Sequence, residues 1–327
     1  MLKEKKKIPS LVYETTQVLK KACKFGTSKN SDKHNAKNNK LKYDTYTKNN
    51  IYSKKEYKCM KKTCVAFVKF CRSNYKVRFL NQIKSYMFTE FIKRGHYKTE
   101  IKYNSRTAAT YFAEVKKLEN IYNAKNNTNI KFCDKDYKKF ITEENKKKIQ
   151  MPREVHDKII KRCYETNYEN GLAFDLARAA GLRVSEITNL RKKDFHFNKN
   201  GKFHGIKIFR SKGGRTRYIE SKSFSEKQIK VINSVYNYFN NKITDGERLF
   251  KSKSDSYIQS FRRARNFVTN YNEKYEFCGV HSMRKEFAND YYDRETKEKG
   301  RDELEVKQNL TKILGHNRTE VLNSYLR

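Results

Sequence analysis

Six residues in the second half of this sequence are of types that could together act on a phosphodiester. They are, in chain order, Arg183, Lys212, His281, Arg284, His316 and Tyr325. A tyrosine hydroxyl can attack phosphorus and form a covalent intermediate. Cationic side chains can neutralise the charge that builds up on the phosphate oxygens during the transfer. The sequence therefore contains the groups that a phosphodiester transferase needs without a metal ion.

Tyrosine is a weak nucleophile at neutral pH. A phenol has a pKa near 10, so only about one tyrosine in a thousand is ionised at pH 7. His281 is the candidate for accepting the proton of Tyr325. Arg183 and Arg284 are the candidates for binding the phosphate, because a guanidinium holds two oxygens at once whereas lysine acts as a point charge. The loss of one well-placed donor of this kind typically lowers a rate by about 10² to 10³.

Each candidate lies in a short motif. Gly-Leu-Arg at 181–183 is followed three positions later by Glu186, and Lys-Gly-Gly at 212–214 lies between two strand-like stretches. His-Ser-Met-Arg at 281–284 precedes Leu-Gly-His at 314–316, and Tyr325 follows nine positions after His316. In this order the motifs resemble the catalytic half of the tyrosine recombinase, or phage integrase, family over about residues 152–327.

The resemblance implies roles for the remaining residues. Lys212 would act as the general acid that protonates the leaving 5′ oxygen, and His316 would donate a hydrogen bond to the phosphate. Glu186 would orient the neighbouring cations. Tyr325 would cut one strand, leave a 3′-phosphotyrosyl link and a free 5′ hydroxyl, and pass the strand to a partner duplex. The expected activity is site-specific recombination or integration of a mobile element or plasmid, with protomers assembled on double-stranded DNA.

Two other functions are compatible with these residues. The same chemistry could nick and reseal a single duplex, as a type IB topoisomerase or a plasmid transfer-origin nickase does. Whether a second duplex is joined separates these outcomes. A catalytically silent DNA-binding relic is the alternative outside the enzymes, although the presence of all six residues argues against it. The sequence identifies no accessory DNA-binding protein.

The net charge points to a polyanionic partner. Lys and Arg number 75 against 36 Asp and Glu, which gives a formal net charge of +39, as expected for a protein that binds nucleic acid. Base bias in a genome also enriches lysine and asparagine. By itself it would not produce so large an excess of basic over acidic residues. The candidate DNA contacts near the proposed site are Arg210, Arg215, Arg217 and Lys285.

Several classes of protein are excluded by what the sequence lacks. No apolar run approaches the roughly 20 residues of a membrane span, and the basic start leads into no apolar signal core. The seven cysteines contain no Cys-x-x-Cys pair, which disfavours zinc. No carboxylate cluster suits magnesium, so we expect no metal and no cofactor. The expected location is a reducing cytoplasm, in association with the nucleoid or a plasmid.

Composition and periodicity predict three parts. Residues 1–52 are basic and are expected to be partly flexible. Residues 53–148 carry apolar stripes at helical spacing, such as Cys64, Phe67, Val68 and Cys71, which predict a helical DNA-binding bundle. Pro152 is suited to a first helical turn and opens a catalytic domain over 149–327. The expected fold is mainly α with a small β-sheet, and the resemblance implies a core-binding bundle and a catalytic domain that clamp DNA.

Two features depart from the family pattern. Residues 291–306 are longer and more charged than usual, and we expect them to form a solvated helix extension. Only two residues follow Tyr325 in this sequence, so we expect no helix there that docks on a neighbour. On this basis the free protein should be monomeric and should assemble on DNA.

Overall fold

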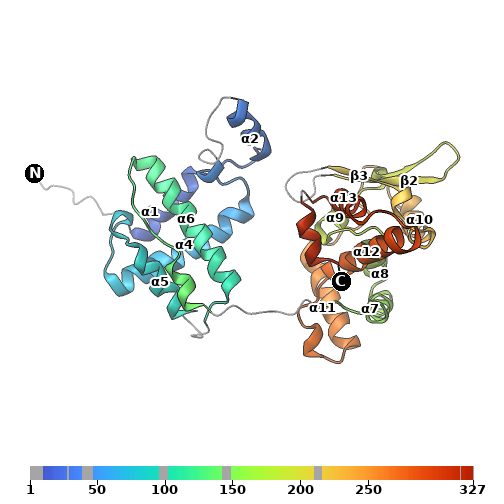
Figure 1. Cartoon of the computed structure of the whole chain (residues 1–327). Coiled ribbons are helices and arrows are strands. Elements are labelled where there is room, and N and C mark those ends of the chain that lie inside the picture. The colour runs from blue at the N-terminus through green and yellow to red at the C-terminus, as the bar shows by residue number, and fades with distance from the viewer. Residues whose placement is uncertain are drawn as a thin grey trace, which may run out of the picture. The chain divides into compact units, whose positions relative to one another are not determined.

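The computed structural model describes residues 10–27, 29–38, 47–95, 102–141, 149–209, 216–316 and 318–326. The chain divides into two compact units, Met1–Lys146 and Lys147–Arg327, each with its own apolar core. Both are built mainly from helices (Figure 1). None of the helices in the described residues has the length and apolar character needed to cross a membrane.

The first unit is a helical bundle. Its helices are α1 (Leu11–Lys21), α2 (Lys29–Asn38), α4 (Lys54–Tyr75), α5 (Ser85–Arg94) and α6 (Ser105–Asn126), with short 3-10 turns η1 (Leu80–Gln82) and η2 (Asp136–Phe140). Ser53 caps α4 by accepting a hydrogen bond from the Glu56 amide at 3.1 Å, as expected for a serine at this position. The aromatic rings of Phe67, Phe88 and Phe91 pack edge to face or tilted in the core.

The described residues among the first 52 belong to the helical bundle. Leu11 and Leu19 of α1 are buried in the same core as α4, and so is Ile51. Residues 29–38, in a stretch rich in lysine and asparagine, form helix α2. Apolar residues spaced along 11–21 therefore tie this segment to the bundle, and composition alone did not reveal them.

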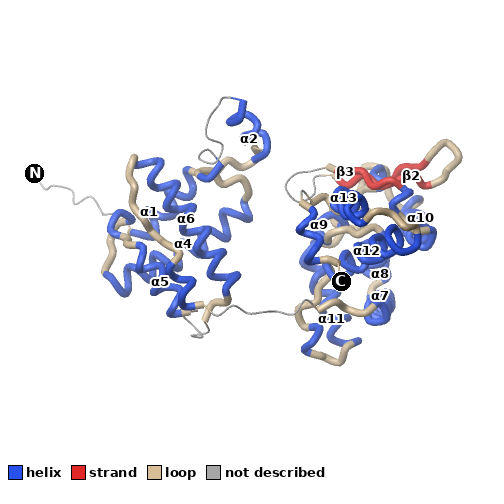
Figure 2. Tube along the Cα trace, in the orientation of Figure 1, coloured by secondary structure: helices blue, strands red, loops and turns tan. Residues whose placement is uncertain are grey.

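The second unit surrounds a three-stranded antiparallel sheet with helices. Its helices are α7 (Arg153–Thr166), α8 (Tyr168–Ala179), α9 (Val184–Ile187), α10 (Glu226–Asn240), α11 (Ser254–Val268), α12 (His281–Asp293) and α13 (Glu303–Ile313). The strands are β1 (Phe195–Phe197), β2 (Phe203–Ile208) and β3 (Arg217–Glu220), in the order β1-β2-β3. Strands β2 and β3 lie side by side in Figure 2. The expectation of a mainly α fold with a small sheet is confirmed.

The sheet follows from alternating side chains. Ile206 of β2 faces Ile219 of β3, and both are buried, while their neighbours Lys207 and Tyr218 are exposed. This period of two places one face of the hairpin on the core. The hairpin tip falls outside the described residues, and it contains three predicted site residues, Arg210, Lys212 and Arg215.

Residues 291–306 combine a helix extension with one buried acid. Helix α12 continues into a π-helical turn, η6 (Arg294–Glu298), in which Glu295 is 2% exposed. The Glu295 carboxylate accepts hydrogen bonds from Arg294 and Lys299 and pairs with Arg301 at 3.1 Å. These contacts are local to the turn, whereas Arg294 Nη2 donates to the carbonyl of Ser223 at 2.9 Å and so ties the turn to the rest of the domain. Residues 297–305 are exposed, as expected for a solvated extension.

Candidate active site

Four short stretches of the second unit bring five of the six predicted residues together. Arg183 immediately precedes α9, and His281 and Arg284 lie on the first turn of α12. His316 follows α13, and Tyr325 follows the 3-10 turn η7 (Thr319–Ser324). The sixth residue, Lys212, lies outside the described residues.

Close packing between two of these stretches depends on a glycine. Gly181 precedes Arg183 and has a φ of +62°, and a Cβ atom there would lie 2.5 Å from the ring of Phe287 on α12. Only glycine meets both conditions without strain. The Gly-Leu-Arg motif therefore places Arg183 beside α12 because its first residue has no side chain.

Glu186 anchors the cations. Its carboxylate is buried and accepts hydrogen bonds from the backbone amide of Arg183 at 2.9 Å and from Arg183 Nη1 at 2.8 Å. Arg217 donates to both carboxylate oxygens, at 2.8 and 3.0 Å. Burial opposes ionisation of Glu186, but the hydrogen bonds and charges of Arg217 and the charge of Arg284 prevail, and they hold its pKa well below the usual range. Glu186 is thus an ionised support that orients guanidinium groups.

Arg284 is a fully buried cation, with 0% of its surface exposed. It donates Nη1 to the carbonyl of Gly181 at 2.5 Å and Nη2 to the carbonyl of Leu314, and its Nη1 lies 3.6 Å from Glu186. Burial and the nearby charge of Arg183 lower its pKa to about 10, while Glu186 opposes the shift. The guanidinium therefore stays charged at neutral pH, and its backbone partners compensate part of the cost of burial.

His316 lies between the two arginines. Its Nε2 atom is 3.3 Å from Arg183 Nη2 and 3.2 Å from Arg284 Nη2. A guanidinium offers only donors, so Nε2 accepts both contacts and the proton of the neutral ring is on Nδ1. Burial, followed by the charges of Arg284 and Arg183, lowers the His316 pKa to about 4. In the absence of DNA this histidine is a neutral acceptor.

The depressed pKa of His316 makes stability depend on pH. Between pH 6.5, its ordinary pKa, and about 4 the unfolded chain binds a proton that the folded chain does not. The free energy of unfolding should therefore fall as pH is lowered through this window. We expect His316→Gln, which can still accept hydrogen bonds but does not titrate, to flatten that fall. Urea unfolding at several pH values measures the difference, and parallel profiles for the two proteins would contradict it.

Tyr325 lies inside its own chain's cluster. Only 3% of the residue is exposed. Its ring meets those of His281 and His316 edge to face, at centroid distances of 5.1 and 5.3 Å, and the Arg284 Cζ atom lies 5.9 Å from the ring centroid. The phenol is thus surrounded by the groups that the sequence analysis assigned to proton transfer and phosphate binding.

Arg217 supports the site from within the domain, which the sequence did not predict. It was a candidate DNA contact, but its side chain is 9% exposed and it donates to Glu186 and to the carbonyl of Ile313 at 2.7 Å. A signal existed, because Arg217 shares a strand face with Ile219, which is buried. Lys285, the other described candidate contact, is half-buried on α12 next to Arg284.

Residues 150–327 match the model of the phage integrase family. The match covers more than half of the chain, so the chain belongs to this family and is a tyrosine recombinase. The confirmed family and the site described above agree with the resemblance found in the sequence. No match is found among curated proteins.

Solved structures of similar fold come from the same class of enzyme. XerH site-specific recombinase bound to palindromic difH is 17% identical, with a TM-score of 0.63 over 96% of this chain and 91% of that chain. A lambda integrase(75–356) dimer on a COC′ core site is 15% identical, with a TM-score of 0.60 over 84% and 88%. The Tn1549 transposon integrase with transposon right end DNA is 15% identical, with a TM-score of 0.54 over 81% and 95%. At these identities the likeness shows the fold.

Proposed function

We propose that this recombinase cuts DNA through attack of Tyr325 on a phosphorus atom and exchanges strands for a mobile element or a plasmid. The bond between the Tyr325 oxygen and phosphorus forms as the bond from phosphorus to the 5′ oxygen breaks. The products are a 3′-phosphotyrosyl link and a 5′ hydroxyl. Attack by the 5′ hydroxyl of a partner duplex reverses the step and joins the exchanged strand.

One observation carries this proposal: two guanidinium groups converge on one atom beside a buried tyrosine. Arg183 and Arg284 both direct Nη2 toward His316 Nε2, at 3.3 and 3.2 Å. A phosphate oxygen bound between the two arginines would accept a hydrogen bond from each guanidinium group. His316 Nε2 would then be able to take up a proton and donate a hydrogen bond to the phosphate. The buried Nε atom of Arg284 has no hydrogen-bond partner in the described part of the chain, so it is a further donor for the phosphate.

The remaining roles are the two proton transfers. The His281 ring lies against Tyr325 at 5.1 Å and is exposed, so it can pass the phenolic proton to solvent. The 5′ oxygen needs a proton as it leaves, and we assign this role to Lys212. Among the described residues no cluster of three or more His, Cys, Asp and Glu side chains could hold a metal ion.

The direct test is a covalent adduct. A duplex with a nick beside the cut loses the short cleaved fragment, so that rejoining fails and the enzyme stays attached. We expect a complex that survives denaturation in the presence of EDTA, with the phosphotyrosyl group on the peptide that contains Tyr325. The effect of removing the hydroxyl is argued in the Discussion.

The solved relatives support an assembly on mobile DNA. One is a transposon integrase in complex with transposon right end DNA, and another is a lambda integrase tetramer bound to a Holliday junction. Protomers of this chain would pair on two duplexes in the same way. Joining of a second labelled duplex to the product strand distinguishes recombination from nicking and resealing.

We further propose that residues 53–148, which carry most of the helices of the first unit, bind the DNA backbone. Helix α4 exposes Lys58, Lys61 and Lys62, which are spaced to share one helix face. Each lysine that neutralises a phosphate contributes about 0.9 to the slope of log affinity against log salt. Changing all three to glutamine should reduce the slope by roughly 0.9 for each phosphate that is no longer neutralised. Lys20→Gln with Lys21→Gln on α1 is the control, and an equal change in slope for each lysine removed in the two variants would remove α4 from the interface.

A further inference from the structure

The main chain of Tyr325 is held by two side-chain amides. Its carbonyl oxygen accepts a hydrogen bond from Asn289 Nδ2 at 3.0 Å and another from Gln150 Nε2 at 2.9 Å. Asn289 lies on α12 and is 6% exposed, and Gln150 lies just before α7. These two donors come from distant parts of the sequence, yet both meet the peptide group of one residue.

This carbonyl needs partners from outside its own turn. Tyr325 ends η7, and its amide donates to the carbonyl of Leu322 at 2.7 Å. The last carbonyl groups of a helical turn receive no hydrogen bond from within the turn, so donors from elsewhere must satisfy them. Two donors on one oxygen fix the plane of the peptide that follows Tyr325. They thereby restrict the backbone from which the phenol projects.

Asn289 ties the nucleophile to the phosphate-binding helix. Its amide nitrogen also donates to the carbonyl of Lys285 at 2.7 Å, one turn earlier on α12. The amide is therefore oriented by the same helix that carries His281 and Arg284. A shift of Tyr325 relative to Arg284 would have to break this contact.

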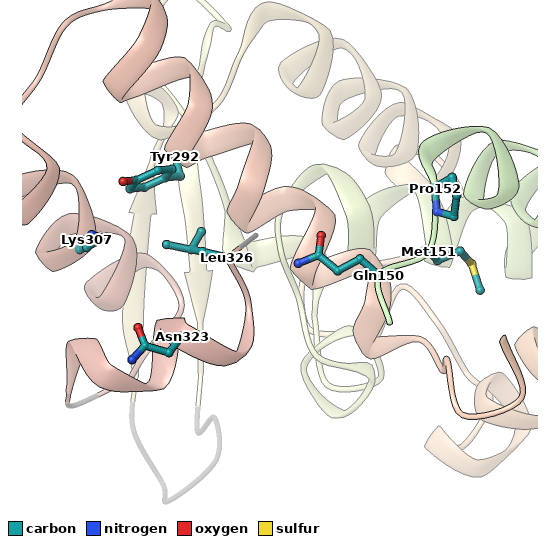
Figure 3. A pocket seen from close by; sticks show the side chains of 7 residues that line it. All are labelled: Gln150, Met151, Pro152, Tyr292, Lys307, Asn323 and Leu326. Atoms are coloured by element: carbon teal, nitrogen blue, oxygen red, sulfur yellow. The ribbon is translucent and has the colours of Figure 1, made fainter. Parts of the chain in front are cut away.

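Gln150 holds the same carbonyl from the start of the second unit, which begins at Lys147. Figure 3 shows Gln150 with Leu326, the residue after Tyr325, among the side chains lining a cavity of about 870 Å³. Asn323 and Pro152 line it as well. Leu326 is only partly buried beside this cavity, so the two hydrogen bonds add to the packing that restrains the tyrosine segment.

We propose that Gln150 and Asn289 are positioning residues for the tyrosine nucleophile. They act through the main chain of Tyr325, and they hold the phenol toward Arg183 and Arg284. The inference rests on the proposed role of Tyr325 as the nucleophile.

Isosteric substitutions test the two contacts. Asn289→Asp and Gln150→Glu keep the shape of each side chain and replace its donor group by an oxygen, which repels the carbonyl. We expect each to lower the single-turnover rate of adduct formation by about 10-fold, and the pair together by about 100-fold, because a displacement of about 1 Å can cost 10² in rate. Asn323→Asp, which adds the same charge to the cavity wall that Gln150 also lines, should retain the wild-type rate within about twofold.

Hydrogen exchange separates positioning from general damage to the fold. Amides of 319–326 should exchange faster in the two variants, while those of 184–190 around α9 should be unchanged. Wild-type rates in both variants, or faster exchange in both segments, would overturn the proposal. If Tyr325→Phe still forms the adduct, the proposed function itself fails. Loss of the adduct in that variant alone, with normal rates in Asn289→Asp and Gln150→Glu, would refute only the positioning role.

Discussion

Tyr325→Phe is expected to bind target DNA with normal affinity and to form no covalent adduct. The substitution removes one oxygen and leaves the ring that packs against His281 and His316 at 5.1 and 5.3 Å. Arg183 and Glu186 keep their contacts, and Arg284 loses only its hydrogen bond with the Tyr325 hydroxyl, so the phosphate should still bind. Removal of the nucleophile from an enzyme with covalent catalysis can cost about 10⁶ in rate. We expect at least a 10⁴-fold loss, which is below detection in a gel assay of the nicked substrate.

A second tyrosine provides the matched control. Tyr292 is half-buried, lines the cavity near Leu326 and lies outside the cluster around His316. Tyr292→Phe should therefore form the adduct at the wild-type rate. DNA binding is measured by gel shift in parallel for both variants. An undiminished adduct in Tyr325→Phe would remove Tyr325 from the nucleophile role.

Sequence alone identified the residues of the cluster because their motifs carry local constraints. A glycine with positive φ precedes Arg183, and Glu186 follows one turn later, so that this acid could be expected to orient neighbouring cations. The small sheet was predictable because Ile206 and Ile219 alternate with exposed residues. Such patterns span only a few positions, so they can be recognised without knowledge of the tertiary contacts.

The contacts that the sequence did not reveal join distant positions. Gln150 and Tyr325 are 175 positions apart, and Asn289 and Tyr325 are 36 apart. A glutamine before a helix and an asparagine within one carry no mark of such a partner. Arg217 was obscured in another way, because it follows a run of cations that are equally suited to DNA. The two hydrogen bonds from its guanidinium group to Glu186 depend on where α9 lies relative to β3.

The two arginines of the cluster should respond differently to substitution. The Arg183 side chain is 15% exposed, whereas Arg284 is fully buried and donates to the carbonyls of Gly181 and Leu314. Removing Arg183 leaves Glu186 paired with Arg217. Removing Arg284 leaves two buried carbonyls without their donor and a cavity in the core. The contacts of Arg183 are thus largely replaceable, whereas Arg284 holds three stretches of the fold together.

Arg284→Ala should therefore lose both activity and stability. Removal of one partner from a buried ion pair typically costs about 3–5 kcal/mol of unfolding free energy. Loss of the phosphate donor should lower the cleavage rate by about 10² to 10³ in the molecules that remain folded. Arg183→Ala should show a similar fall in cleavage with a much smaller loss of stability. Urea unfolding and single-turnover cleavage at low temperature measure the two effects separately.

Arg284→Lys separates charge from geometry. A lysine keeps the positive charge beside Glu186, but its single ammonium group cannot reach both carbonyls and a phosphate oxygen as the planar guanidinium can. We expect it to restore part of the lost stability and to leave cleavage about 10²-fold below the wild type. Near-normal cleavage in Arg284→Lys would show that charge alone suffices at this position. Near-normal stability in Arg284→Ala would show that the contacts to Gly181 and Leu314 do not hold the domain together.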